Sequence, residues 1–225
     1  HYWHAFGKDA VVFGGGSVLH TAQDINIKRS LVRITGKGYA LGVGLGPFQN
    51  SAAEKACAAF LNECEFVGVR DKHSLALAQS LAPAASVKST FDLAPLLLEH
   101  PQLFAQRSDH KQGICVCLCP QERLLGRPED ERARLQSLAT ALNEVALATG
   151  EKITLLDFNG HSQLGDGPVH QELRALLSPE LEISHIAYQN NPLRVMQILA
   201  SFKVVLGMRL HASILAFLVN TPVIS

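Results

Sequence analysis

Short, nearly continuous apolar runs alternate with helical patterns along most of the 225 residues. Parallel strands that are covered on both faces lose the apolar–polar alternation of a half-exposed strand, and a strand, a helix and a further strand build a βαβ unit. The alternation therefore predicts an α/β fold with parallel sheets. The expected strands are residues 10–16, 39–46, 66–71, 113–119, 152–158 and 203–208, and the final TPVIS reads as one more.

Helix-start and helix-stop signals lie between these runs. Ser51 and Glu54 have the spacing of a capping box, and Pro128 opens a segment with apolar residues three and four apart. Gly150 closes that segment as a C-terminal cap, and Asn191–Pro192 begins another helix. These signals support the strand–helix alternation.

A polar, proline-interrupted stretch at residues 96–112 breaks the rhythm. We place a domain boundary within it, which predicts two Rossmann-like, doubly wound domains, residues 1–105 and 106–225, facing each other across a cleft. Ligands of such sheets bind at the carboxyl ends of the strands, so the loops there are where site residues are expected. The first residue is histidine and the last residues are still apolar, so we expect a fragment truncated at both ends.

Composition narrows the class of protein. Lys plus Arg and Asp plus Glu are 20 each, without runs of like charge, which argues against a nucleic-acid surface. The five cysteines form a poor disulfide framework and favour a reducing compartment. No apolar run reaches the roughly 18 to 20 residues of a spanning helix. We expect a cytoplasmic protein without a transmembrane segment.

Three glycines and a serine, Gly14, Gly15, Gly16 and Ser17, follow the first apolar run. Glycines allow backbone N–H groups to approach a substrate closely. The pattern is neither GxGxxG nor a P-loop, so it does not support nucleotide binding. These residues are candidates for substrate binding, and a plain tight turn is the alternative.

Arg70 and Asp71 follow the third apolar run. Asp71 suits the N-cap of the next helix, but a cation at a helix N-terminus opposes the dipole. That mismatch is better tolerated when an anion lies between them. Arg70 therefore faces a ligand or the other domain, or else forms an ordinary surface ion pair.

Arg209 and His211 are the strongest candidates for site residues in the sequence. They follow Gly207 at the end of an apolar run and begin a helix whose Leu210, Ile214 and Phe217 or Leu218 are expected in the core. A helix N-terminus favours anions, arginine grips a carboxylate or phosphate with two hydrogen bonds, and histidine exchanges protons near neutral pH. The alternative is a capping histidine and a salt bridge between domains.

Two other groups receive structural interpretations. Cys115, Cys117 and Cys119 share one strand face and are expected to form a small buried surface rather than a metal site. His161, Asp166 and His170, in a glycine-rich segment, are interpreted as solvated loop residues rather than metal ligands or a mobile acceptor loop. We predict no metal site.

With these residues in hand, the chain resembles the polysaccharide pyruvyl transferase family. The family's motifs occur in order over nearly the whole chain, with one departure, Asn220 in place of a glycine. The matching residues are Gly14 to Gly16, LGVGLGP at 41–47, Arg70, Asp71, Ser74, Asp92, Ala94, Gly207, Arg209, His211, Ala212, Ala216, Pro222 and Ile224.

The resemblance implies a GT-B-like fold with the acceptor side in the first domain and the donor side in the second. It implies transfer of pyruvate from phosphoenolpyruvate to a sugar or glycan, possibly lipid-linked, with a ketal formed and phosphate released, and no cofactor. Arg209 then holds the donor, His211 is the general acid and base, Arg70 adds positive charge, and Asp92 orients a partner residue or an acceptor hydroxyl.

Two alternatives stay open. A GT-B glycosyltransferase that uses a nucleotide-sugar donor would share the fold, and fold does not fix function. Asp157 is its one candidate ribose partner. A non-catalytic, sugar-binding member of the fold is the other alternative.

Overall fold

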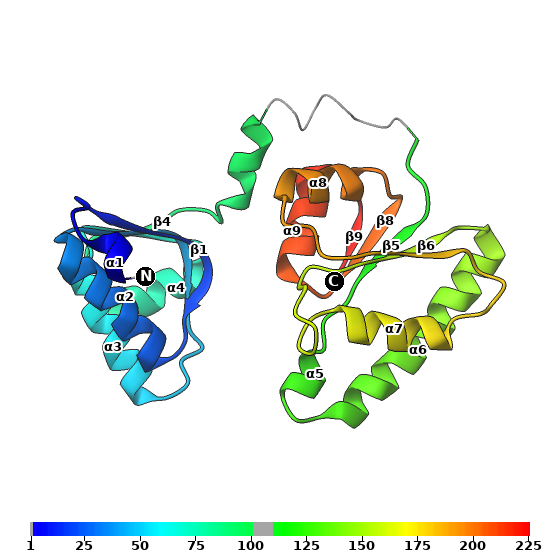
Figure 1. Cartoon of the computed structure of the whole chain (residues 1–225), viewed down its shortest axis with the longest axis horizontal. Helices are drawn as coiled ribbons and strands as arrows, with labels where there is room; N and C mark the ends of the chain where they lie inside the picture. Colours follow the sequence, from blue (N-terminus) through cyan, green and yellow to red (C-terminus); the bar gives the residue numbers. More distant parts are fainter. Residues whose placement is uncertain (1, 101–109) are drawn as a thin grey trace. The chain divides into compact units, whose positions relative to one another are not determined.

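The computed structural model describes residues 2–100 and 110–225, except for the side chains of Tyr2 and Ser17 (Figure 1). The chain divides into two compact units, His1–Pro95 and Leu96–Ser225. The boundary expected between residues 105 and 106 lies outside the described residues. No helix of the described part is both long and apolar enough to cross a membrane.

The N-terminal unit alternates strands and helices. Its elements are α1 (Tyr2–Ala5), β1 (Val11–Leu19), α2 (Ala22–Thr35), β2 (Gly38–Leu45), α3 (Ser51–Glu63), β3 (Phe66–Val69), α4 (Lys72–Leu81) and β4 (Val87–Ser89), followed by a 3-10 helix, η1 (Ala94–Glu99).

The sheet of this unit has the order β1-β2-β3-β4, all parallel. Right-handed crossovers between strands in sequential order return on the same side, so α2, α3 and α4 cover one face and pack on one another (Figure 1). The prediction of a doubly wound sheet is wrong for the described part of this unit, because the strand order never reverses. Val12 on the edge strand β1 is 59% exposed.

The core of the N-terminal unit lies between the sheet and these helices. Phe60 of α3 is fully buried, and its ring meets that of Phe13 edge-on with 5.5 Å between centroids. Gly14 to Gly16 lie inside β1, in agreement with the strand expected at residues 10–16, so the alternative of a tight turn is wrong. Gly16 has φ +91, and the pairing register with β2 shifts between Gly16 and Leu19. The glycines therefore permit a strand irregularity rather than a chain reversal.

The C-terminal unit continues the alternation. Its elements are β5 (Ile114–Cys117), α5 (Gln121–Leu124), α6 (Pro128–Thr149), β6 (Ile153–Leu156), α7 (Gly167–Leu176), β7 (Ile183–Ile186), α8 (Pro192–Ala200), β8 (Val204–Gly207), α9 (Leu210–Leu218) and β9 (Val223–Ile224).

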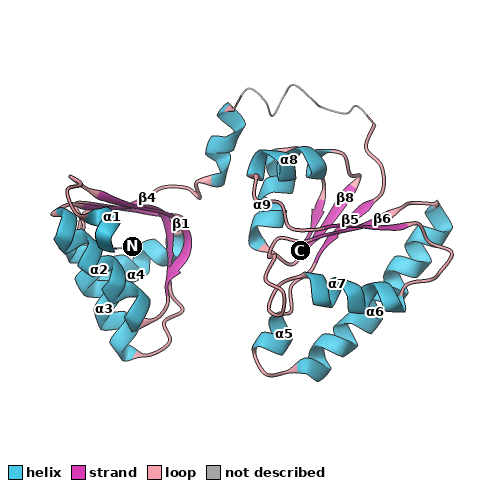
Figure 2. Ribbon diagram, in the orientation of Figure 1, coloured by secondary structure: helices cyan, strands magenta, loops and turns pink. Residues whose placement is uncertain are grey.

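The C-terminal sheet is parallel and has the order β7-β6-β5-β8-β9. The chain moves from β5 to one edge and then returns to build the other, so this unit is doubly wound. Figure 2 shows α6 and α7 on one side of the sheet and α8 and α9 on the other. The topological switch point, where ligands of such sheets bind, lies between β5 and β8.

Most helix signals are confirmed. Asp71 caps α4, Asn191 caps α8, and Gly150 ends α6 in the left-handed conformation. The N-cap of α3 is Asn50 instead of Ser51, because the Asn50 side chain accepts the N–H of Ala53. The boundary of this helix therefore lies one residue earlier than the capping-box spacing predicts.

The expected inner face of α9 is wrong in part, since Ile214 and Leu218 are half-buried. Leu210 and Phe217 are exposed, whereas the smaller Ala212 and Ala216 are buried together with Leu215. The helix packs closely against α8 and β8, so small residues occupy the contact. The three cysteines of the β5 region, Cys115, Cys117 and Cys119, are buried as expected.

Candidate functional site

Arg209 lies at the switch point of the C-terminal sheet. The turn after β8 is tied to the end of β5 because the N–H of Met208 donates to the carbonyl of Cys117 at 2.9 Å. Arg209 follows with extended dihedral angles as the N-cap of α9, and its side chain makes no capping hydrogen bond. The first turn of α9 therefore begins at the carboxyl edge of β8 without a side-chain cap from its own N-cap residue.

A buried carboxylate fixes the Arg209 guanidinium. Nε of Arg209 donates to Oδ1 of Asp166 at 3.1 Å, and Nη2 donates to the same oxygen. Asp166 is 0% exposed, and its Oδ2 accepts the N–H groups of Phe158 and Asn159 at 2.8 and 2.9 Å. This carboxylate is fully hydrogen-bonded, as a buried charge must be. The Arg209 side chain is 28% exposed, and within the described residues its Nη1 makes no hydrogen bond.

The interpretation of Asp166 and His170 as solvated loop residues is wrong. Both are buried, and of the three residues in that group His161 alone is exposed. Asp166 lies directly before α7, which places it beside the backbone N–H groups that follow β6. The sequence signal was the Asp-Gly-Pro helix start, but the partner Arg209 is 43 residues away and no local pattern reveals it.

His211 lies in the first turn of α9 and is exposed. It shares this turn with Arg209, so a permanent cation and a titratable ring stand at one helix N-terminus, as expected. The switch point also holds Cys119, where burial raises the pKa of the thiol and the neighbouring Arg209 charge opposes that rise. The arrangement can bind an anion and exchange a proton beside it.

A second cluster lies at the carboxyl ends of β6 and β7. Oδ1 of Asp157 is 2.6 Å from Nδ1 of His170 and 2.9 Å from Nε2 of His185. The N–H of Leu118 donates to Nε2 of His170 at 3.0 Å, so that nitrogen carries a lone pair and Nδ1 carries the proton. Burial lowers the pKa of His170, against the opposing effect of Asp157, which agrees with a neutral ring.

This cluster offers three potential metal ligands, whose ligand atoms lie within 4.8 Å of one another. A metal at Nδ1 of His170 would require Nε2 to take the proton, which would then face the Leu118 N–H. The backbone amide therefore works against a site with both histidines as ligands. Hydrogen bonding explains the geometry of Asp157, His170 and His185 without an ion.

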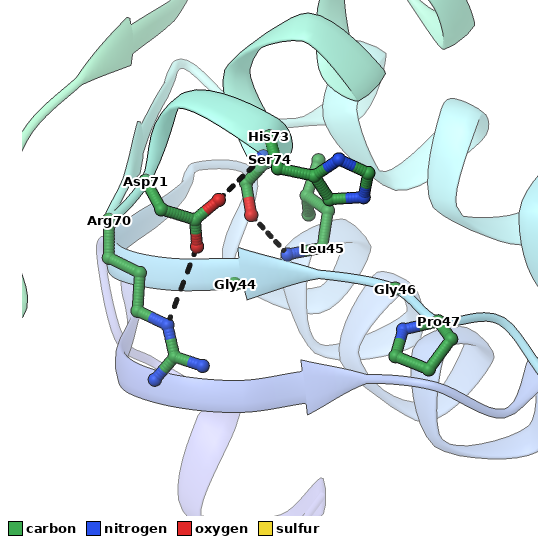
Figure 3. A pocket seen from close by; sticks show the side chains of 8 residues that line it. All are labelled: Gly44, Leu45, Gly46, Pro47, Arg70, Asp71, His73 and Ser74. Carbon is green, nitrogen blue, oxygen red and sulfur yellow. Dashed lines mark hydrogen bonds and ion pairs between the residues drawn. The ribbon is translucent and has the colours of Figure 1, made fainter. Parts of the chain in front are cut away.

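Arg70 of the N-terminal unit lines a cavity of about 240 Å³ (Figure 3). Nε of Arg70 is 3.7 Å from Oδ2 of Asp71, and Nη1 is 3.5 Å from Oδ2 of Asp92. The guanidinium lies over Gly44, where an added Cβ would be 2.9 Å from Nε. Gly44 of the LGVGLGP segment therefore makes room for the Arg70 guanidinium.

The N-terminus of α4 is already occupied by Asp71, whose Oδ1 accepts the N–H of Ser74 at 2.7 Å (Figure 3). Partial burial raises the pKa of Asp71, but hydrogen bonds from Ser74 and the Arg70 charge outweigh it and leave that pKa below its ordinary value. The Ser74 hydroxyl accepts the N–H of Leu45 at 2.9 Å. Asp71 and Ser74 therefore have structural roles that tie α4 to β2.

The remaining predicted residues lie around the segment that follows β4. Asp92 accepts the N–H of Ala94 at Oδ1 (3.0 Å), and positions for a Cβ on Gly14 and Gly15 lie within 3.8 Å of Leu93. The fold thus brings the β1 glycines beside the Asp92 segment, where their small size leaves space for Leu93. Ser17 lies in β1, and its side chain is outside the described part.

Two units on parallel sheets, one doubly wound with an anchored arginine at its switch point, place the protein among α/β proteins of the Rossmann type. Two solved structures share the fold. One is a putative UDP-N-acetylglucosamine 2-epimerase from Listeria monocytogenes: TM-score 0.60, 14% identity, 96% of this chain and 55% of that chain covered. The other contains accessory secretory proteins 1, 2 and 3 of Streptococcus pneumoniae: TM-score 0.50, 16% identity, 99% and 41% covered.

This chain thus spans about half the length of the first structure, and at such identities the likeness concerns the fold alone. None of the curated proteins matches the chain. The family model of the polysaccharide pyruvyl transferases matches residues 1–225. The chain belongs to this family.

Proposed function

We propose that this protein transfers the pyruvyl group of phosphoenolpyruvate to a sugar of a polysaccharide or its precursor, within a GT-B-like fold. The ketal is formed with two sugar hydroxyls, and phosphate is released. One observation carries the proposal: Arg209, fixed by the buried Asp166, stands with His211 at the N-terminus of α9. Membership of the family supports the pyruvyl class of reaction.

Donor binding rests on Arg209 and the first turn of α9. Phosphoenolpyruvate carries a carboxylate and a phosphate, which both suit a guanidinium and a helix N-terminus. Asp166 holds one edge of the guanidinium, so the Nη1 edge presents itself in a fixed orientation. A pre-oriented cation loses little conformational entropy when the donor binds. In this scheme the arginine and the helix dipole hold the donor anions, and no metal is invoked.

His211 supplies the proton transfer. In the proposed step, His211 protonates the methylene carbon of the donor while a sugar hydroxyl adds to the adjacent carbon and loses its proton. Phosphate then leaves with its bonding electron pair, and the second hydroxyl attacks the same carbon and loses its proton to close the ring. One of the two released protons restores His211, and the other leaves with the phosphate.

In the N-terminal unit, we assign Arg70 to an anionic group of a substrate and Asp92 to orientation of an acceptor hydroxyl. The cavity of about 240 Å³ beside Arg70 supports this assignment. Gly14, Gly15, Gly16 and Ser17 are proposed to contribute by shaping the space around the Asp92 segment instead of cradling a phosphate. Their position inside β1 favours that more limited role.

Release of inorganic phosphate and formation of a ketal test the proposal together. The protein is incubated with phosphoenolpyruvate and a panel of glycosides, and phosphate and the ketal methyl group are followed by NMR. We expect His211→Gln to lower kcat by about 10²- to 10⁴-fold. We expect Arg209→Ala to abolish donor binding as well.

Gln136→Ala, an exposed change on α6, is the matched control and should turn over at the rate of the unchanged protein. Full activity of His211→Gln would refute the role of the histidine. A nucleotide-sugar donor that is consumed while phosphoenolpyruvate is not would assign the site to a glycosyltransferase, and binding without turnover of either donor would favour a non-catalytic module.

A further inference from the structure

A cavity of about 290 Å³ opens at the carboxyl ends of β6 and β7, in the C-terminal unit. Its volume is near the lower end of the range for small-molecule sites. The cavity is lined in part by His185, Asp157 and the loop that follows β6, with Gln171 from the first turns of α7. The mechanism proposed above uses none of these side chains.

His185 faces this cavity in a fixed orientation. Its Nε2 lies 2.9 Å from Oδ1 of Asp157, and its side chain is 31% exposed. In the neutral ring the proton on Nε2 donates to Asp157, and Nδ1 carries a lone pair. Within the described residues that Nδ1 makes no hydrogen bond. His170 holds the same carboxylate from the buried side, so the position of Asp157 is fixed as well.

The lining suits a neutral, hydroxyl-rich ligand. Asp157 is its one charged side chain, and an anion would meet that carboxylate without a compensating Lys or Arg in the lining. The side chains of Ser162 and Gln171 make no hydrogen bonds within the described part of the chain, so both can donate and accept. Gly167 leaves the approach to Oδ2 of Asp157 open, since a Cβ there would lie 3.6 Å from that oxygen.

We propose that this cavity is a sugar-binding subsite, in which one hydroxyl donates to Nδ1 of His185 and a second donates to Oδ2 of Asp157. Ser162 and Gln171 supply the remaining hydrogen bonds. The inference deepens the proposed function. The identification of this sugar as part of the acceptor glycan rests on that function. Binding of the sugar itself does not depend on pyruvyl transfer.

The test is an NMR titration of the histidine side chains in the whole protein, with His185→Gln used to assign the His185 resonance. Methyl glycosides of galactose, glucose and N-acetylglucosamine are added in turn, followed separately by phosphoenolpyruvate, uridine and Zn²⁺. We expect at least one glycoside to shift the Nδ1 resonance of His185 saturably. Phosphoenolpyruvate should leave that resonance in place.

Ser162→Ala and Gln171→Ala test the lining without touching the buried network, because both residues are exposed. Each should weaken glycoside binding about five- to tenfold, the equivalent of one lost hydrogen bond. The exposed change Gln136→Ala on α6 is the control and should leave the affinity unchanged. Equal affinity in all three variants would overturn the proposal.

Other outcomes are equally decisive. No glycoside shift, a shift with uridine alone, or Zn²⁺ binding without any glycoside response would overturn the sugar subsite. Failure of the subsite and failure of the proposed function are distinguishable in the same sample. Pyruvyl transfer with an unmoved His185 resonance would refute the subsite alone, whereas a glycoside shift without any transfer would refute the function alone.

Discussion

Each unit places an arginine between a parallel strand and the helix that follows it, yet the two arginines are held differently. Arg70 lies 3.5 Å from Asp92, at the edge of hydrogen-bonding distance, and the helix that follows is already capped by Asp71. Arg209 has two N–H groups on the buried Asp166, and the helix that follows receives no cap from the Arg209 side chain.

The difference explains why the two ends are suited to different tasks. A carboxylate at the N-terminus of α4 already satisfies the dipole and competes with an external anion, so Arg70 acts as a single charge in a polar cavity. At α9, the Arg209 side chain provides no cap, and we propose that its Nη1 edge and the helix N-terminus bind the same anion. We therefore assign the donor to the β8–α9 turn.

The largest expected effect comes from removing the buried carboxylate. Asp166→Asn leaves the guanidinium without its charged partner and should destabilise the C-terminal unit by about 3 kcal/mol, the lower end for a broken buried pair. The matched change Asp92→Asn, in the weaker pair of the N-terminal unit, should cost about 1 kcal/mol or less.

Native-state hydrogen exchange measures these two changes, with the amides of β6 as the probe for Asp166→Asn and those of β3 as the probe for Asp92→Asn. An equal loss of unfolding free energy in the two units would mean that the two arginines are held alike. The proposed contrast between them would then be wrong.

Filling the space beside the Arg70 guanidinium should have a smaller effect on stability. Gly44→Ala brings a Cβ to 2.9 Å from Nε of Arg70, so we expect the side chain to move from Asp92 at a cost of about 1 kcal/mol. The counterpart Gly207→Ala meets Ser213 at 2.7 Å instead and should leave the Arg209–Asp166 pair in place. Crystal structures of both variants check this, and an unmoved Arg70 would contradict it.

The pH dependence of stability should also separate the units. Because burial lowers the pKa of His170 in the folded state, the unfolded chain takes up this proton at higher pH, near 6.5. This contribution to stability is complete above about pH 6.5 and is lost as the pH falls below it. The free energy of unfolding, measured by hydrogen exchange of the β6 amides, should fall less between pH 7.5 and 5.5 in His170→Gln than in the unchanged protein. The same fall in both proteins would contradict the account.

Much of the fold followed from the sequence because it depends on local signals. The strands around residues 39–46 and 203–208 and the caps at Asp71 and Asn191 were predicted from apolar runs and side-chain chemistry. The strands β4 and β7 were missed. β4 is three residues long, and β7 carries an exposed Ser184 and His185 instead of a continuous apolar run.

The site was predicted less completely. Arg209 and His211 became candidates because they interrupt an apolar helix start at a strand end, and the structure places both at the start of α9. The partners Asp166 and His185 were missed, since their importance depends on contacts 43 and 28 residues away in the chain. The inner face of α9 was also wrong in part, because tight packing favours alanine over leucine there and no period in the sequence reveals that closeness.

Thermal protection by phosphoenolpyruvate tests the central assignment most directly. The unchanged protein, Arg209→Ala and Arg70→Ala are each heated with phosphoenolpyruvate or with nucleotide sugars. At about one hundred times its dissociation constant a ligand adds about 2.7 kcal/mol of stability. We predict that phosphoenolpyruvate protects the unchanged protein and Arg70→Ala but not Arg209→Ala, and protection that persists in Arg209→Ala, or protection by nucleotide sugars alone, would contradict donor binding at the β8–α9 turn.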